Sequence, residues 1–570
     1  MESMSPVYTL TNECQDCYKC VRRCPVKAIK IQDSRAGVIP HKCISCGNCV
    51  LSCPSNAKQV RNDIDKVRQL LQFKEPVIVS LAPSWRGAFE YSNQKMISIL
   101  QHLGFSAVSE TALGAQEVSI ETASMLNHSK PGLYISSACP VIVDYIRYYR
   151  PEFTDNIATL ASPALTHAKL LKNSFGEDVR VVFIGPCIGK KNESDRHQDL
   201  ISAALTFEEL KIWFKEEDID VNDIEIKENA SFVPEDAKEG AIYPMDGGMN
   251  KTISRVGVKD HVQLINISSL DLFAKSLNDL DLSKIEKTIF VEALACVGGC
   301  ISGPCMSSKR SDFSIISDVL TNTSYRTSIP KKAQVVVPLR YESAKVETKV
   351  YSLEELQKSL KVIGKLTPSD ELNCGGCGYQ TCRGLAKALL DGDAEPQMCV
   401  SYMRQLAIRK ADAMFKFMPS AMIMLDKNFN ISEANEAFIR MFSGKRSKLH
   451  LSHPDHIIGC YAGDILGLNA IFKKVLKSGN DIRKERYSYQ GKFYALYIFC
   501  AEKGESIGVL ITDTTPFQGN KEKIATRARE VISKNITIVQ EIASMLGEHM
   551  VETETLLSSI ADDFDEEEGN

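Results

Sequence analysis

The sequence predicts a multidomain chain that combines α/β with α+β architecture, and three observations lead to this prediction. The chain has 570 residues, too many for one hydrophobic core, and its 44% apolar and 25% charged residues are typical of globular proteins. A cysteine-rich duplication opens the chain, and a region in which short apolar runs alternate with helical stretches follows it. Beyond residue 411 the closely spaced cysteines end and the pattern changes again.

The charge and the cysteine content narrow the classes of function. A net charge of -4 without a dominant basic patch predicts no nucleic acid and no membrane as partner. Residues 1–10 show no charged segment followed by an apolar one, and no run approaches the roughly 18 apolar residues of a membrane-spanning helix. We therefore expect a cytoplasmic protein. Because cytosolic thiols are kept reduced, nineteen cysteines indicate metal binding in preference to disulfides.

The two N-terminal cysteine runs are an internal duplication, Cys14-x2-Cys17-x2-Cys20-x3-Cys24-Pro25 and Cys43-x2-Cys46-x2-Cys49-x3-Cys53-Pro54. This spacing resembles that of bacterial ferredoxins, in which three close cysteines bind one 4Fe-4S cluster and the fourth crosses to the other. We expect a ferredoxin-like fold at residues 1–60, with one cluster on Cys14, Cys17, Cys20 and Cys53 and a second on Cys43, Cys46, Cys49 and Cys24. Two zinc sites are the alternative, although zinc usually needs only paired C-x2-C units. The implied function is electron transfer with a ferredoxin-like carrier.

Residues 76–345 are predicted to form a domain of parallel strands and helices. Residues 77–81 are a short apolar run rich in β-branched residues, typical of a buried strand. Similar runs lie at 131–135, 180–184 and 288–292, and they alternate with helical stretches such as 94–103 and 163–172. In such folds the loops at the carboxyl ends of the strands bind ligands.

Four cysteines follow these predicted strands. Cys139 and Cys187 each come just after a strand-like run, whereas Cys296 and Cys300 stand four residues apart beside two adjacent glycines. Glycine lets the backbone approach a bulky inorganic cluster closely. We expect the four thiolates to be metal ligands. The alternative for the last pair is that both cysteines are buried as small hydrophobic residues.

In this order, residues 135–140, 184–193 and 292–303 resemble the three signature segments of the FeFe hydrogenases, and the resemblance spans about residues 76 to 320. It implies that Cys139, Cys187, Cys296 and Cys300 hold a 4Fe-4S cubane. It also implies that Cys300 bridges to a two-iron unit with carbonyl, cyanide and a bridging dithiolate, so that the whole forms the H-cluster. Maturation proteins for the two-iron unit are then implied partners.

The resemblance also assigns roles around the H-cluster. It implies that Lys190 donates a hydrogen bond to a cyanide and that Glu193 pairs with Lys190; an ordinary surface ion pair is the alternative for this spacing. The implied loop that contacts a cyanide consists of Ala82, Pro83 and Ser84. The other implied neighbours are Pro186, with Gly185 and Leu294 where the family has methionines.

The departures from the family pattern concentrate on proton delivery. Ala138 stands where the family has the cysteine that relays protons, and alanine cannot titrate. The relay glutamates and serine are replaced by Thr122, Met125 and Ala158. Proton transfer needs suitable groups within hydrogen-bond reach, so the usual route is dismantled. Cys305 adds a thiol near Cys300, either as a structural residue or as a substitute relay.

Another cysteine group follows a predicted connector at 346–370, which is rich in Lys, Ser and Glu. Cys374, Cys377, Cys382 and Cys399 lie across a helical stretch that resembles the small helical 4Fe-4S domain of several anaerobic redox proteins. We expect this domain at residues 366–408. Zinc is the alternative, because C-x2-C also binds zinc, although Gly378-Tyr379 after Cys377 does not suggest a zinc ribbon.

Residues 411–518 contain no cysteines at ligand spacing. The apolar run 422–425, the turn 426–428 and the helical stretch 434–438 resemble the opening of a PAS domain, and predicted strands at 487–499 and 507–512 fit the same sheet. PAS domains sense or transmit signals. An apolar ligand pocket and a filled core look alike in sequence, so both alternatives stay open. Cys460 and Cys500 are predicted to be isolated packing residues.

The last segment, residues 519–570, is predicted to be a signalling helix with an acidic tail. Residues at alternating spacings of three and four form one seam, which consists of Ala528, Val531, Asn535, Ile538, Ile542 and Met545. This spacing is typical of a coiled coil, and a polar seam residue fixes register and partner number. A helix packed on the PAS domain is the alternative. We predict a disordered tail after Ala561, and we expect a homodimer through the helix or the PAS domain.

Together these features resemble the sensory branch of the FeFe hydrogenases. We predict a slow hydrogenase (H2 ⇌ 2H+ + 2e−) that reports hydrogen or redox state to a downstream signalling protein. Its expected cofactors are four 4Fe-4S clusters and the two-iron subcluster. One alternative is a related iron–sulfur protein of electron transfer or cluster assembly that lacks the two-iron unit. The other is a metabolic hydrogenase, which the missing relay disfavours.

Overall fold

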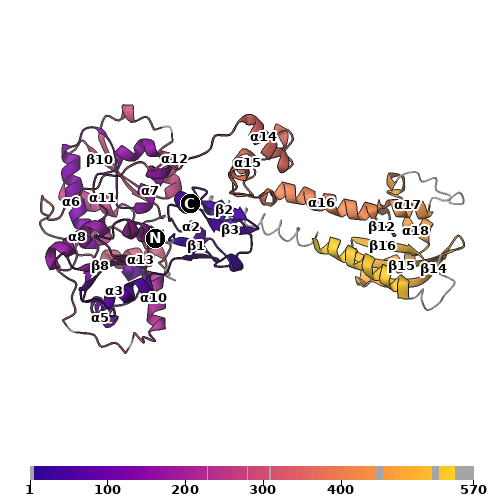
Figure 1. The fold of residues 1–570 in the computed structure, drawn as a ribbon, viewed down its shortest axis with the longest axis horizontal. Coiled ribbons are helices and arrows are strands. Elements are labelled where there is room, and N and C mark those ends of the chain that lie inside the picture. The colour runs from indigo at the N-terminus through magenta and orange to yellow at the C-terminus, as the bar shows by residue number, and fades with distance from the viewer. Residues whose placement is uncertain are drawn as a thin grey trace. The chain divides into compact units, whose positions relative to one another are not determined.

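The computed structural model describes residues 5–221, 223–227, 229–278, 280–306, 310–442, 454–515 and 526–545. The chain divides into two compact units, Met1–Glu395 and Pro396–Asn570 (Figure 1). The acidic tail predicted after Ala561 and both ends of the predicted signalling helix lie outside the described residues. Within the described ranges, no helix is both long and apolar enough to cross a membrane.

The N-terminal cysteine duplication folds into two halves with the same local structure. Its two antiparallel sheets pair β1 (Val7–Thr9) with β4 (Lys58–Val60) and β2 (Ile29–Gln32) with β3 (Arg35–Val38). Each cysteine run contains one short helix, α1 (Lys19–Arg23) or α2 (Asn48–Leu51). The residue before each helix has a left-handed backbone, at Tyr18 with a φ of 56° and at Gly47 with a φ of 84°. The repeated sequence therefore gives a repeated turn into a helix.

Two parallel sheets form the central region of the first unit. The larger sheet has the order β6-β5-β8-β9, with bounds Ala107–Glu110, Val77–Leu81, Arg180–Gly185 and Ala203–Thr206. The smaller sheet has the order β10-β11-β7, with bounds Val262–Ser268, Thr288–Leu294 and Gly132–Ile135. Every pairing within them is parallel, as the alternation of apolar runs and helical stretches predicts.

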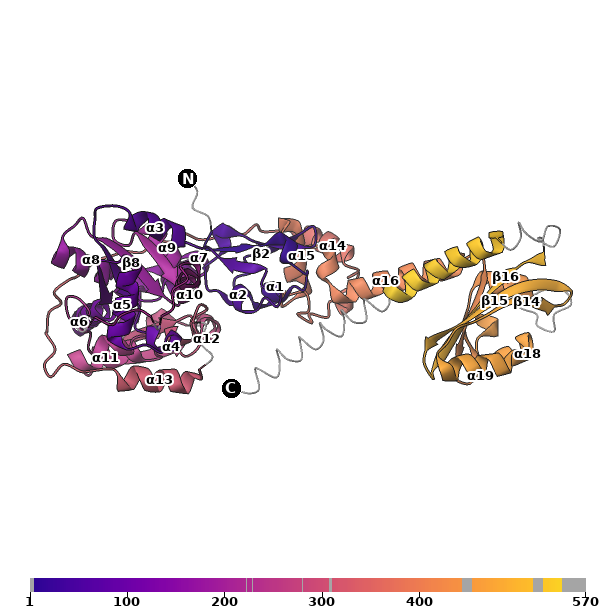
Figure 2. The ribbon, with the colours of Figure 1, turned by 90° about the horizontal axis from the view of Figure 1, so that it is seen from below.

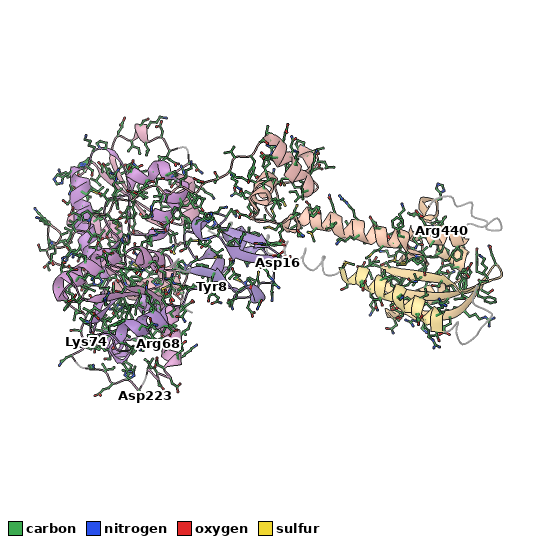
Figure 3. The ribbon with its side chains drawn as sticks, in the orientation of Figure 1. Tyr8, Asp16, Arg68, Lys74, Asp223 and Arg440 are labelled. Atoms are coloured by element: carbon green, nitrogen blue, oxygen red, sulfur yellow. The ribbon has the colours of Figure 1, made fainter. Side chains whose placement is uncertain are left out.

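Helices cover these sheets and connect their strands. The core around the larger sheet is completed by α5 (Asn93–His102), α8 (Pro163–Phe175) and α10 (Phe207–Glu216). The first two correspond to the predicted helices, and each begins at a serine whose side chain accepts a backbone N–H three residues on, Ser92 and Ser162. The other helices are α3 (Ile64–Leu71), α4 (Trp85–Ala88), α6 (Ala112–His128), α7 (Pro140–Tyr149), α9 (Gly189–Arg196), α11 (Gly248–Val256), α12 (Leu270–Ser276) and α13 (Asp312–Thr321). At the surface, Arg68 of α3 forms ion pairs with Glu216 and Glu217 (Figure 3).

The predicted connector at 346–370 is wrong in part, because it contains helix α14 (Leu353–Val362). The helix begins with a capping box, in which the side chain of Ser352 accepts the N–H of Glu355 and the Glu355 carboxylate accepts the N–H of Ser352. Ser359 donates to the carbonyl of Ala386 at 2.8 Å, which joins α14 to α15 (Cys382–Asp391). The Lys and Glu residues that suggested a connector lie on the exposed side of this helix.

The second unit contains a five-stranded antiparallel sheet of order β13-β12-β16-β15-β14. The strand bounds in that order are Ile431–Ala434, Ala421–Asp426, Ser506–Asp513, Lys492–Glu502 and Ile482–Tyr489. Its helices are α16 (Val400–Phe417), α17 (Glu436–Phe442), α18 (Ala462–Leu466) and α19 (Asn469–Ser478). The single strand predicted at 487–499 is instead a hairpin, because Gln490 and Gly491 both have positive φ, at 49° and 80°, as a tight two-residue turn requires.

Residues 526–545 are helical, and this helix packs on the sheet of the second unit. Ile538, Val539 and Ile542 pack against an apolar cluster formed by Met418, Met422 and Leu510. Asn535, which is 4% exposed, donates to the hydroxyl of Ser420 at 2.6 Å. Ile542 and Met545 also line a hollow with residues of α16, which runs beside this helix in Figure 2. In the structure this part of the seam therefore packs on the sheet, which was the alternative to a coiled coil.

Candidate metal centres

The first ferredoxin-type group, here called the outer group, consists of Cys14, Cys17, Cys20 and Cys53. Burial raises the pKa of the Cys20 thiol to about 11, and Lys58 opposes this effect. The other charges that act on this thiol, which all raise its pKa further, belong to Cys17, Cys14 and Cys53. The structure thus brings Cys53 from the second run to the first, as the ferredoxin spacing predicts.

The second group, here called the inner group, consists of Cys24, Cys43, Cys46 and Cys49. Burial raises the pKa of Cys49, and the thiols of Cys43 and Cys24 raise it further. Burial also raises the pKa of Cys43 to about 11, and among its neighbours Cys24 again acts in that direction. Buried thiols lose their protons readily only when a cation is bound, so these groups are suited to an iron–sulfur cluster.

The central group, Cys139, Cys187, Cys296 and Cys300, lies on three loops at the carboxyl ends of parallel strands. Cys139 follows β7, Cys187 follows β8, and the other two follow β11. Burial raises the pKa of the Cys300 thiol, and Cys187 and Cys139 raise it further. On Cys296, burial is again the first effect, and the thiols that add to it belong to Cys300, Cys187, Cys139 and Cys46. The structure thus brings the four predicted cysteines together.

The inner group borders the central group at Gly47. A Cβ atom on Gly47 would lie 2.5 Å from Pro304 Cβ and 3.0 Å from Ile188 Cδ1, so only glycine fits this approach. Ile188 and Pro304 belong to the loops that carry Cys187 and Cys300. Two neighbouring cysteine groups are the arrangement that electron transfer between clusters requires.

The kind of metal centre determines how closely its ligands must approach one point. In the part of the chain that the structure describes, no three His, Cys, Asp or Glu side chains converge as the ligands of one metal ion do. A 4Fe-4S cluster does not need such convergence, because it takes its four thiolates on separate irons. A structural zinc ion, by contrast, needs its ligands at about 2.0–2.3 Å from a single point.

Lys190 and Glu193 form a buried ion pair on α9, just after Cys187. Lys190 Nζ lies 2.6 Å from Glu193 Oε2 and 2.9 Å from Ser162 Oγ, and Ser162 donates to the same carboxylate oxygen at 2.9 Å. The two charged side chains are 10% and 7% exposed, so the alternative of a surface ion pair is wrong. An ammonium group has three donors, and the third has no partner among the described residues. It is suited to an anionic ligand of the central group.

The loop after β5 holds an unpartnered hydroxyl. Ser84 is 1% exposed, and its Oγ has no hydrogen-bond partner among the described residues. The loop is fixed beside β8, because the N–H of Ala82 donates to the carbonyl of Ile184 at 2.9 Å. Burying a hydroxyl without a partner is unfavourable, so an acceptor that the protein chain itself does not supply fits this position. Pro83 precedes Ser84 in the same loop.

Gly185 and Leu294 lie where methionines are expected from the resemblance. A Cβ atom on Gly185 would lie 2.6 Å from the ring of Phe183 and 2.9 Å from Ala82 Cβ, so neighbouring side chains already fill this space. Leu294 is 6% exposed at the end of β11. Pro186 accepts the N–H of Cys305 at 3.0 Å, which connects the second and third cysteine loops.

The positions of the expected proton relay are apolar or unpartnered. Ala138 packs against a cluster that includes Tyr243 and Met249, and Met125 packs against the same cluster. Thr122 is 1% exposed, and its hydroxyl has no partner among the described residues. Ala158 is 4% exposed. None of Ala138, Thr122 and Ala158 therefore supplies a titratable, hydrogen-bonded group for proton transfer.

Cys305 has neighbours that differ from those of Ala138. It is fully buried, and burial raises its pKa. The charges that act on it belong to Glu208, Cys187, Glu209 and Lys191. Cys305 is not a member of the apolar cluster on which Ala138 packs, and both the structural and the relay interpretation of this thiol stay predictions.

Glu292 is a buried acid that the sequence did not single out. It is 1% exposed on β11 and accepts the backbone N–H groups of Asn250 at 2.9 Å and Met249 at 3.2 Å. Burial raises its pKa to about 7, although both N–H groups lower it. Its charge acts on Cys300. A carboxyl group that titrates near neutral pH therefore lies close to the central group. Its place four residues before Cys296 was the only signal in the sequence.

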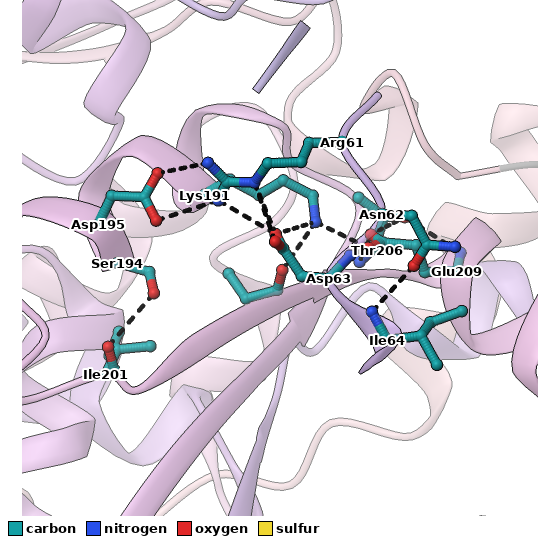
Figure 4. Close-up of polar contacts among 11 residues, drawn as sticks. Arg61, Asn62, Asp63, Ile64, Lys191, Ser194, Asp195, Ile201, Thr206 and Glu209 are labelled. Atoms are coloured by element: carbon teal, nitrogen blue, oxygen red, sulfur yellow. Dashed lines mark hydrogen bonds and ion pairs between the residues drawn. The ribbon is translucent and has the colours of Figure 1, made fainter. Parts of the chain in front are cut away.

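A buried ion network fixes α9 from another side (Figure 4). Lys191 is 0% exposed, and its Nζ lies 2.8 Å from Asp63 Oδ2 and 2.8 Å from Glu209 Oε1. Arg61 joins Asp63 to Asp195, with N–O distances of 2.9 and 2.8 Å. The backbone N–H of Arg61 donates to Pro6 beside β1 at 2.9 Å. The network therefore connects the ferredoxin-like domain to the helix that carries Lys190.

The fourth cysteine group, here called the helical motif, consists of Cys374, Cys377, Cys382 and Cys399. Three of these cysteines belong to the first unit. Cys374 is exposed, Cys377 is 8% exposed, and Cys382 is the first residue of α15. Cys399 belongs to the second unit, where it directly precedes α16.

Solved structures similar to the chain include an FeFe-hydrogenase from Chlamydomonas reinhardtii, with 18% identity and a TM-score of 0.38 over 50% of this chain and 100% of that chain. They also include the PAS domain of nitrogen regulation protein NR(II) from Vibrio parahaemolyticus, with 19% identity and a TM-score of 0.15 over 18% of this chain and 94% of that chain.

Two curated hydrogenases are related in sequence. Iron hydrogenase 1 of Clostridium pasteurianum is 25% identical over 300 residues, which cover 43% of this chain and 52% of that protein. The periplasmic Fe hydrogenase large subunit of Nitratidesulfovibrio vulgaris is 27% identical over 355 residues, which cover 51% of this chain and 84% of that protein. The chain thus spans about half the length of the first of these relatives.

Three family models match separate parts of the chain. Residues 75–304 match the iron only hydrogenase large subunit, C-terminal domain, and residues 6–68 match the 4Fe-4S dicluster domain. Residues 370–401, which contain all four cysteines of the helical motif, match an Fe-S cluster family. The chain is therefore an FeFe hydrogenase-like iron–sulfur protein.

Proposed function

We propose that this protein is a slow, sensory FeFe hydrogenase that catalyses H2 ⇌ 2H+ + 2e−. The observation that supports this best is the convergence of the four central cysteines beside the buried ammonium of Lys190, at the carboxyl ends of parallel strands. Low turnover is proposed because Ala138 lies among apolar side chains where a proton relay would be needed.

The chain's own residues fit an H-cluster. The central cysteines would hold the cubane, with Cys300 shared with the two-iron unit. The remaining donor of Lys190 and the hydroxyl of Ser84 would each donate to a cyanide, which satisfies groups that otherwise have no partner. When bound, the two-iron unit supplies the heterolytic cleavage of hydrogen. Ala82, Pro83, Gly185, Pro186 and Leu294 would shape the protein wall around it.

The remaining regions would carry electrons and the signal. We propose two clusters in residues 1–60, the H-cluster in 76–345 and a further cubane in 366–408, with a ferredoxin-like carrier as electron partner. The PAS domain at 411–518 and the helix in 519–570 would pass the redox state to a downstream signalling protein in the cytoplasm, in a homodimer. The packing of residues 535–542 on the sheet of the second unit supports output through this unit.

A second candidate function is electron transfer or cluster assembly without the two-iron unit. Phe183 and Ala82 occupy the space at Gly185 where the family has a methionine, and the relay positions cannot titrate. In the FeFe hydrogenases the methionine and the relay groups surround the site of hydrogen chemistry, and this chain lacks both. Both features leave the cysteine groups intact.

Reduction by hydrogen separates the two functions. Anaerobic protein supplied with the maturation proteins should contain about 18 iron atoms per chain, from four cubanes and two further irons. Under hydrogen, its 4Fe-4S absorbance should bleach slowly, whereas Cys300→Ala should stay oxidised under hydrogen and still be reduced by dithionite. Zinc at stoichiometric level, or matured protein that bleaches no faster than Cys300→Ala, would contradict the proposal.

Replacing Glu292 with glutamine should change how stability depends on pH. Because burial raises the folded-state pKa from 4.5 to about 7, the folded state holds a proton that the unfolded chain releases between these values. Stability should therefore fall as the pH rises from 4.5 to about 7 and stay constant above, by an amount on the order of 3 kcal/mol. Glu292→Gln should lose this decrease.

The measurement for Glu292 is denaturation of the parent and the variant at several values between about pH 5 and pH 8. Glu152→Gln is the matched control, because this acid is exposed and its pKa is lowered, not raised. Parallel curves for the parent and Glu292→Gln across this window would show that Glu292 is ionised throughout.

A further inference from the structure

The helical iron–sulfur motif packs against the ferredoxin-like domain through a glycine. Gly378 has a φ of 88°, and a Cβ atom there would lie 2.8 Å from Val21 Cγ1 and 3.1 Å from Arg22 N. Arg22 Nη1 donates to the carbonyl of Gly376 at 3.5 Å. Val21 and Arg22 belong to α1, which ends at Arg23, directly before Cys24 of the inner group. The loop that carries Cys377 therefore lies on the helix that leads to Cys24.

Cys377 and Cys24 share neighbouring side chains. Burial lowers the pKa of the Lys27 ammonium, and the charges of Cys24 and Cys377 both oppose this effect. Burial raises the pKa of Tyr379, and Cys377 and Cys24 are again among the charges that add to it. Lys27 is also anchored on α1, since it donates to the carbonyls of Val21 at 3.1 Å and Arg22 at 3.3 Å. The charges of both thiols therefore act on Lys27 and on Tyr379.

The far end of the motif is attached to the same domain. The N–H of Ile31 donates to the carbonyl of Asp393 at 2.9 Å, and the side chain of Asp393 pairs with Lys42. The N–H of Ser34 donates to Glu395 at 3.3 Å. Because the motif is fixed at both ends, the distance between Cys377 and Cys24 is set by the fold.

We infer that the cluster of the helical motif exchanges electrons with the inner cluster by way of Cys377 and Cys24, so that the inner cluster is a branch point. The inner group has three neighbours: the central group next to Cys46, the helical motif next to Cys24, and the outer group. One electron leaves the reduced inner cluster, which is oxidised, and reduces the helical cluster. No bond forms or breaks, and no proton moves.

This branch rests on the proposed cluster assignment and specifies how the redox state would reach the second unit. Hydrogen supplies the electron in the proposed function, and an external reductant can supply it otherwise. The last cysteine of the helical motif, Cys399, directly precedes α16 in the sequence. An electron on the outer cluster is available to a carrier, whereas an electron on the helical cluster resides in the motif that leads into the second unit.

The test is the magnetic interaction between reduced clusters, measured by electron paramagnetic resonance on dithionite-reduced protein that carries its 4Fe-4S clusters but no two-iron unit. In the parent, the resonance signals of the helical and inner clusters should be split by their magnetic interaction. Gly378→Ala should lose this splitting, because the methyl group collides with Val21. Gly375→Ala is the matched control: this glycine also has a positive φ, at 74°, but a Cβ atom there meets nothing within 4 Å. It should keep the splitting.

Asp393→Asn is a second variant that introduces no collision. It removes the ion pair with Lys42 and should weaken the splitting. It therefore provides the test if Gly378→Ala fails to take up its clusters. A parent without any splitting of the helical cluster, or a splitting unchanged in both variants, would overturn the inference. Because no two-iron unit is used, a failure of hydrogen chemistry with the splitting intact would count against the proposed function alone.

Discussion

Replacing Lys191 with methionine is expected to lower the free energy of unfolding of the first unit by about 3–5 kcal/mol. The Lys191 side chain is fully buried, and its ammonium is held by Asp63, Glu209 and the carbonyl of Ala204 at 2.8–2.9 Å. Methionine keeps most of the volume but removes the charge. Two carboxylates would then stay buried without their ammonium, which is the costly way to break a buried ion pair.

The matched control for this prediction is Lys169→Met. The Lys169–Glu177 pair has a similar N–O distance, 2.6 Å, but its side chains are 36% and 69% exposed, so its loss should change stability by about 0–1 kcal/mol. Both variants are compared with the parent by chemical denaturation at equal iron content. If Lys191→Met were no less stable than Lys169→Met, the network of Figure 4 would not hold α9 in place.

Restoring four relay residues together is expected to raise hydrogen turnover by about 10²–10⁴-fold, the range of general acid–base catalysis. The changes are Ala138→Cys, Met125→Glu, Thr122→Glu and Ala158→Ser. Ala138→Cys alone should give only a modest gain, because the thiol would stand against the same apolar cluster on which Met125 packs. The combination should exceed the sum of the single effects, since a relay acts as a unit.

The relay prediction is measured as hydrogen turnover per intact H-cluster, so that misfolded variants are not counted as inactive enzyme. Carboxylates at the buried position 122 and the half-buried position 125 strain the packing, and iron content and cofactor spectra therefore have to match the parent. A full gain from Ala138→Cys alone, or a parent that already turns over as fast as metabolic hydrogenases, would mean that other groups deliver protons. Glu292 would then be the first residue to examine.

Patterns with a fixed spacing predicted the most structure. The duplicated cysteine runs resemble those of bacterial ferredoxins, in which the fourth cysteine of each run joins the other group, and Cys53 and Cys24 lie near those groups in the structure. The apolar runs of β5 and β8 are buried on both faces, which is the signature of parallel strands covered by helices. The loops of Cys139 and of Cys296 and Cys300 meet because β7 and β11 are parallel neighbours in the smaller sheet, whereas Cys187 follows β8 of the larger sheet.

Features that depend on distant contacts were not predictable in the same way. Lys191 looks like Lys190 in the sequence, and only the fold brings Asp63 and Glu209 to it. Glu292 sits in an apolar strand, and its pKa is raised by a burial that only the fold produces, against the opposing effect of the α11 backbone N–H groups. The seam of the last helix suits both a partner helix and a sheet, so the spacing did not decide between them.

Infrared spectroscopy of matured, anaerobic protein tests the central claim most directly. Iron-bound carbonyl and cyanide absorb in a region of the infrared spectrum where few other groups of a protein absorb. The account predicts a set of carbonyl and cyanide bands in the parent that shifts under hydrogen. Lys190→Met should shift the cyanide bands, whereas Lys169→Met, which alters a surface ion pair, should leave them in place. A matured parent with its 4Fe-4S clusters loaded but no such bands would contradict the account and leave an iron–sulfur protein without the two-iron unit.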